Sequence, residues 1–182
     1  MRTIRFAVFS LILGAIVAAG AFAQADSHTV SVNIPEIALL AINGGNVTLE
    51  IQEPLNPGEA GTGDSDAATR LFYTSLVPSG GFKKITAEAA GALVPGGTSI
   101  TVEATSIAAT GTGGTAAGAV TFTNMLAGAQ DFVTGIESAY TGINPATDGA
   151  VLTYTLSFAD YTALRALAAP AVFTVTYTIT AQ

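Results

Sequence analysis

Apolar and hydroxyl-bearing side chains alternate along much of residues 29–180, and this period of two constrains the fold more than any other feature. The alternation is clearest near the end of the chain, where threonines separate Phe173, Val175, Tyr177 and Ile179. Successive side chains of a β-strand point to opposite faces, so the pattern is typical of strands with one face in a core and the other in solvent. Helical periodicity is scarce, and we therefore expect an all-β protein.

The same pattern predicts ten short strands, separated by turns rich in Gly, Pro and Asp. These strands cover residues 29–34, 37–42, 46–51, 70–77, 82–89, 98–106, 119–125, 131–136, 151–158 and 172–180. So many short strands with turns between them favour an antiparallel β-sandwich, either Ig-like or jelly-roll-like.

Two local features complete the predicted fold. Asp160 is suited to cap a short helix over residues 160–167, with Leu164 and Leu167 facing inward. Tyr140 is followed by Thr141-Gly142, at a strand end, and we expect it to be a corner tyrosine whose buried hydroxyl holds the backbone of a loop. An exposed tyrosine that stacks on a ligand is the alternative at this position.

The first 23 residues have the layout of a secretory signal peptide. Arg2 and Arg5 precede an apolar run over residues 6–19, and an Ala-Phe-Ala tripeptide ends the segment. The run is shorter than the roughly 20 apolar residues of a membrane-spanning helix. We therefore expect residues 1–23 to be a cleaved signal peptide and residues 24–182 to form a single β-sandwich domain. The mature protein is expected to be secreted or at the cell surface, after transit through the periplasm.

Charge and cysteine content exclude several classes of site. Beyond residue 23 the chain has thirteen acidic residues and only four cations, Arg70, Lys83, Lys84 and Arg165, which gives a net charge of about −9. Binding to a polyanion relies on many Lys and Arg side chains, so we expect no nucleic-acid partner. The chain contains no cysteine, which rules out disulfides, thiolate nucleophiles and cysteine-based metal sites.

The histidine content argues against catalysis. His28 is the single histidine, and it lies close to the predicted new N-terminus. A serine hydrolase needs a base held beside its nucleophile, and zinc sites commonly use several His or Cys ligands. We therefore predict that the protein is not an enzyme.

An acidic, glycine-rich loop at residues 58–66 is the candidate metal site. Glu59, Asp64 and Asp66 supply closely spaced carboxylates, which are ligands that calcium prefers. The loop lacks the ligand spacing and the terminal glutamate of an EF-hand. Acidic turns of this kind also occur without metal, so calcium is one of two interpretations of this loop.

Residues 29–42 contain a candidate interaction strand. Val30, Val32 and Ile34 share one face, and Pro35 then interrupts the alternation. Proline in a sheet is confined to edges, strand starts and bulges, so we expect a kinked edge strand. Such a strand either completes its own sheet or is exchanged with a neighbouring molecule.

Three segments resemble a group of uncharacterised secreted bacterial β-sandwich proteins. They are VNIPEIALL at residues 32–40, GIESAYTG at residues 135–142 and TVTYT at residues 174–178. The resemblance implies export and a sandwich fold, and no known activity. In architecture the chain is also similar to pilin and adhesin subunits, which often carry a disulfide that is missing here.

These features together predict a non-enzymatic structural or adhesive protein of the bacterial surface. Self-association by strand exchange would make it a subunit of a filament or pilus-type assembly. The alternative is a carbohydrate- or calcium-binding β-sandwich module with a glycan or another surface molecule as partner. No cofactor other than calcium is expected, and no membrane span.

Overall fold

The computed structural model describes residues 27–123 and 128–182, and the predicted signal peptide lies outside these residues. The chain divides into two units, Met1–Asn33 and Ile34–Gln182. In the first unit, the described residues 27–33 are exposed and have no regular secondary structure. The second unit contains every strand of the described chain.

The described residues of the second unit form eleven β-strands and one 3-10 turn, so this unit is nearly all β. The strands are β1 (Ile37–Asn43), β2 (Asp64–Leu76), β3 (Lys83–Gly91), β4 (Thr98–Ala108), β5 (Thr110–Gly111), β6 (Thr115–Ala116), β7 (Val120–Phe122), β8 (Gln130–Ile136), β9 (Ala139–Tyr140), β10 (Gly149–Phe158) and β11 (Phe173–Ala181). The 3-10 turn η1 spans Tyr161–Ala163.

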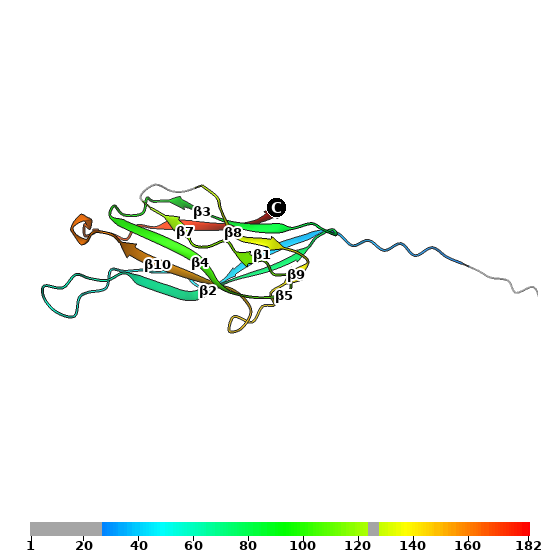
Figure 1. Cartoon of the computed structure of the whole chain (residues 1–182), viewed down its shortest axis with the longest axis horizontal. Helices are drawn as coiled ribbons and strands as arrows, with labels where there is room; N and C mark the ends of the chain where they lie inside the picture. The colour runs from blue at the N-terminus through cyan, green and yellow to red at the C-terminus, as the bar shows by residue number, and fades with distance from the viewer. Residues whose placement is uncertain (1–26, 124–127) are drawn as a thin grey trace, which may run out of the picture. The chain divides into compact units, whose positions relative to one another are not determined.

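Seven of the strands form the larger antiparallel sheet, in which β2 is the longest strand. One side of β2 pairs with β1 along residues 70–76, and the other side pairs first with β10 and then with the short β9. Beyond β10 the order continues through β4 to β7, and beyond β9 it ends at β5. Figure 1 shows β2, β10 and β4 running beside one another. Among the described strands, the outermost strands of this sheet are therefore β1 on one side and β7 and β5 on the other.

The smaller sheet has the order β11, β3, β8, β6, and all its pairs are antiparallel. The inner faces of the two sheets share one hydrophobic core, whose largest fully buried side chains are Phe122, Phe132, Leu71, Ile85, Ile136, Leu152, Val94, Val102 and Val133. The predicted antiparallel β-sandwich is thus confirmed. It is an open sandwich, because neither sheet closes on itself.

The last strand confirms the alternation that predicted it. Tyr177 is buried, and the apolar residues on either side of it are half-buried against the core. The four threonines that alternate with these residues are exposed. In β10 the inward positions Leu152, Tyr154 and Leu156 are buried in the same way. One face of each strand therefore belongs to the core, as the period of two requires.

Two predicted strands are wrong, because backbone pairing did not follow the apolar pattern. Residues 29–34 form no strand, and residues 46–51 form none either. Val47, Leu49 and Ile51 nevertheless pack against the core. Their segment is held by a side-chain contact, since the Glu50 amide donates to the Asp64 carboxylate instead of to the backbone of a neighbouring strand.

Several boundaries also differ from the prediction. β7 covers only residues 120–122 of the predicted strand 119–125, whose last two residues lie outside the described residues, and β5, β6 and β9 were not predicted. β2 begins at Asp64, within the predicted loop, because β10 offers it a partner along residues 152–156. The predicted helix at 160–167 is only the turn η1, and Leu167 is 54% exposed rather than inward-facing. The Asp160 cap is confirmed, since its side chain accepts a hydrogen bond from the Thr162 amide at 2.8 Å.

The prediction that Tyr140 is a buried corner tyrosine is wrong, although another tyrosine has this role. Tyr140 is 53% exposed in β9. Tyr73 has that role instead, because its buried hydroxyl donates a hydrogen bond to the carbonyl of Gly113. Desolvation by burial raises the pKa of Tyr73 to about 12, so the donor stays protonated.

Candidate functional site

The candidate interaction strand exposes its apolar side chains. Val30, Val32 and Ile34 are 72%, 80% and 74% exposed, and residues 27–36 make no strand pairing within the described chain. A run of alternating apolar residues in this state leaves both its side chains and its backbone without strand partners. We call residues 29–34 the donor segment.

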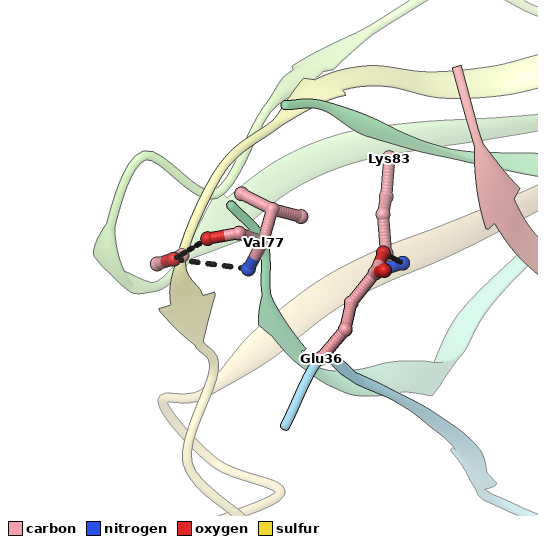
Figure 2. Close-up of polar contacts among 4 residues, drawn as sticks. Glu36, Val77 and Lys83 are labelled. Atoms are coloured by element: carbon pink, nitrogen blue, oxygen red, sulfur yellow. Dashed lines mark hydrogen bonds and ion pairs between the residues drawn. The ribbon is translucent and has the colours of Figure 1, made fainter. Parts of the chain in front are cut away.

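An ion pair fixes the chain where the donor segment leads into β1. Glu36 Oε1 accepts a hydrogen bond from Lys83 Nζ, and Figure 2 shows the two side chains meeting. The Lys83 side chain is 6% exposed and that of Glu36 is 53% exposed. Beside this pair, the Val77 amide donates to Ser138 Oγ at 3.2 Å, which holds the end of β2. Because a buried ammonium is costly without a partner, Glu36 holds the start of β1 in place.

Two long strand edges are free on the same side of the sandwich. Within the described residues, β1 pairs only with β2, and β11 pairs only with β3. The two edge strands also contact each other. Free edges carry unpaired backbone amides and carbonyls, which bind a further strand readily.

A cavity of about 660 Å³ opens next to these edges, and we call it the edge groove. One wall is formed by residues 42–49 and the other by residues 170–175, with Ile100 and Tyr154 at its inner end. Its lining residues are Ile42, Gly44, Gly45, Asn46, Val47, Thr48, Leu49, Thr69, Ile100, Tyr154, Pro170, Ala171, Val172, Phe173, Thr174 and Val175. None of them is Asp, Glu, Lys, Arg or His, so the groove is uncharged.

A buried tyrosine pair joins the two sheets behind the edge groove. The hydroxyl oxygens of Tyr154 in β10 and Tyr177 in β11 lie 2.9 Å apart, and the Tyr177 ring packs on Phe132 with centroids 5.1 Å apart. Burial raises the pKa of both hydroxyls, so both stay neutral. The pair links an edge strand of the small sheet to the centre of the large sheet.

The predicted calcium ligands engage separate local partners. Glu59 accepts hydrogen bonds from the backbone and side-chain nitrogens of Asn56. Asp64 and Asp66 both lie in β2, where they accept bonds from nearby backbone amides. Among residues 27–123 and 128–182, no group of three or more His, Cys, Asp or Glu side chains is arranged to hold a metal ion. Calcium binding at this loop stays a prediction.

His28 is exposed and lies in the part of the first unit that has no regular secondary structure. The described residues include no helix that is both long and apolar enough to cross a membrane.

The edge groove and the Glu36–Lys83 pair were both missed in the sequence. The groove walls come from segments more than a hundred residues apart, and no spacing rule connects them. Gly44-Gly45 lies in the turn between the predicted strands 37–42 and 46–51, and the lack of charge in both groove walls was visible in the sequence. Nothing in the sequence pointed to Lys83 as a buried cation.

Comparison with known proteins gives no assignment, since no family model, no curated protein and no solved structure matches the chain. The resemblance to secreted sandwich proteins therefore stays a prediction, and function has to be argued from the geometry.

Proposed function

We propose that this protein is an exported, non-enzymatic structural or adhesive subunit of the bacterial surface, whose copies join by strand exchange. The observation that carries the proposal is the donor segment. Its three apolar side chains alternate as a strand requires, yet all three are more than 70% exposed. Such a segment has the side-chain pattern of a strand but no sheet to pair with, and a neighbouring copy can supply a sheet edge.

The magnitude of this exposure supports the proposal. Fully burying one Val or Ile side chain stabilises by about 1.5 to 3 kcal/mol. Because the three side chains are 72%, 80% and 74% exposed, burying the exposed part of all three offers about 3 to 7 kcal/mol. Ordering six backbone residues costs about 6 to 12 kcal/mol, which is more. Side-chain burial alone therefore does not suffice, and the donor segment must also form backbone hydrogen bonds with a free sheet edge.

The exposed threonines of β11 suit a surface protein of this kind. Thr174, Thr176, Thr178 and Thr180 form a hydroxyl-rich row on the small sheet, next to Glu88 and Lys84 of β3. The high net negative charge keeps such a chain soluble outside the cell.

The test compares residues 24–182 with a variant that lacks residues 24–33. The deletion lies within the first unit, so the sandwich is expected to keep its circular dichroism spectrum. We expect the longer chain to form oligomers or filaments that grow with concentration, seen by light scattering and negative-stain microscopy, and the deletion variant to stay monomeric. A matched control replaces Thr29, Ser31 and Asn33 by alanine, which leaves the apolar positions intact and should preserve assembly.

A longer chain that stays monomeric at every concentration would refute the strand-exchange proposal. Binding of that monomer to calcium by calorimetry, or to glycans on an array, would then favour the alternative of a binding module.

A further inference from the structure

We infer that the edge groove, together with the free edge of β11, is the acceptor for the donor segment of a second copy of this chain. The inference rests on the proposed function and specifies its second half, namely where the donated strand binds.

The two surfaces match in charge. The donor segment, TVSVNI, carries no charged side chain, and neither do the residues that line the edge groove. Beyond residue 23 the chain has a net charge of about −9, so two copies of it repel each other. An uncharged strand in an uncharged groove brings two copies together where that repulsion is weakest.

The two surfaces also match in pattern. A six-residue strand spans about 20 Å, and β11 has nine residues along its free edge. If the donor segment pairs with β11, its valines and Ile34 face the groove together with Phe173 and Val175. Ser31 and Asn33 then face solvent beside the exposed threonines of β11. This arrangement continues the small sheet by one strand without burying a polar side chain.

The edge of β11 is the better template among the free edges. The opposite wall of the groove, residues 44–49, has no strand geometry and offers no regular row of backbone groups. The edges at β6 and β7 are two and three residues long, too short for a six-residue partner. Within the described chain β1, with seven residues, also has an edge of comparable length, and cysteine cross-linking can test it in the same way as β11.

Single cysteines can locate the acceptor because the natural chain has none. The donor copy carries Ser31→Cys, and the acceptor copies carry Thr174→Cys or Thr176→Cys on β11, Ala38→Cys on β1, or Thr121→Cys on β7. All five positions are exposed, so the sandwich core is unchanged. Each donor–acceptor mixture is oxidised mildly, and the disulfide-linked heterodimer is quantified, since a disulfide forms only when the Cα atoms lie within about 7 Å.

We expect the β11 mixtures to give at least tenfold more heterodimer than the β7 mixture. Preferential linkage to β1 or β7, in samples that light scattering shows to be assembled, would overturn the acceptor assignment and leave strand exchange standing. Absence of assembly in all samples, including the cysteine-free chain, would overturn both.

A second variant tests the groove itself. A Cβ added at Gly45 meets no heavy atom within 4 Å, and the residue does not have a left-handed backbone. Gly45→Phe should therefore fold and place a ring in the groove. Gly96→Phe is the matched control, because Gly96 is equally open and lies outside the groove lining. We expect assembly to be lost in the first variant and retained in the second, and assembly of both to the same extent would overturn the groove as acceptor.

Discussion

The buried tyrosine pair allows a sharp test of how the two sheets are held together. Tyr154 and Tyr177 share a hydrogen bond of 2.9 Å, and each residue is less than 10% exposed. Removing one hydroxyl leaves the other in the core, whereas removing both leaves no polar group there. The two single variants and the double variant should therefore differ in a specific way.

The structure sets the order of these effects. Tyr154→Phe leaves the Tyr177 hydroxyl without its partner. Tyr177 does not line the edge groove, so this buried hydroxyl stays unsatisfied, which should cost about 1 to 3 kcal/mol of unfolding free energy. Tyr177→Phe leaves the hydroxyl of Tyr154, a residue that lines the edge groove. Water that enters through the groove is expected to replace the lost partner, so the cost should be about 0.5 to 1.5 kcal/mol. The double variant should lose less than the sum, because neither hydroxyl remains to be satisfied.

Urea unfolding followed by circular dichroism measures these differences, since the chain has no tryptophan for fluorescence. For a slope of about 2 kcal/mol per molar urea, a loss of about 2 kcal/mol lowers the midpoint by about 1 M. The double-mutant cycle should give a coupling of about 1 to 2 kcal/mol. Two single variants of unchanged stability, with a double variant equal to their sum, would refute the pairing of the hydroxyls.

Three further predictions concern stability. E36Q should lower the unfolding free energy by about 1 to 2 kcal/mol, because it removes the charged partner of the buried Lys83 side chain. The loss is kept to this size because the Glu36 side chain is half exposed to water. An unchanged urea midpoint would contradict this prediction. Stability should fall as the pH rises from about 10 toward 12, because burial raises the pKa of Tyr73 to about 12 and the unfolded chain releases that proton earlier; Tyr73→Phe should flatten part of this fall, measured as urea midpoints across the range. Gly63→Ala should cost about 2 to 4 kcal/mol, since its Cβ would lie 2.1 Å from the carbonyl oxygen of Leu156, and unaltered hydrogen exchange at the start of β2 would show that the backbone accommodates it.

Strands that bury one face were predictable from the sequence alone. Residues 172–180 and 151–158 carry a period of two because one side meets the core and the other meets water, and both are strands within one or two residues. The start of β2 was missed because Asp64-Ser65-Asp66 has a low strand propensity, which its pairing with β10 overrides. The segment 46–51 shows the converse, since its apolar residues reach the core without any sheet pairing of their own.

The candidate site was also predictable from the sequence only in part. The donor segment was visible as alternating apolar residues before Pro35, because strand character is a local property of the chain. Its surroundings were not visible, and neither was the partner of Lys83, which depends on where β3 meets the start of β1.

The amino-acid sequence by itself determined that this chain builds strands, buries one face of each and uses neither cysteine nor a histidine cluster. Those properties follow from side-chain type and spacing along a few residues. Only the tertiary structure decided which edges stay free, that β1 and β11 end up on the same side of the sandwich, and that an uncharged groove opens between residues 42–49 and 170–175. Edges and grooves arise from the pairing of distant segments, and pairing depends on hydrogen bonds and packing that no local pattern encodes.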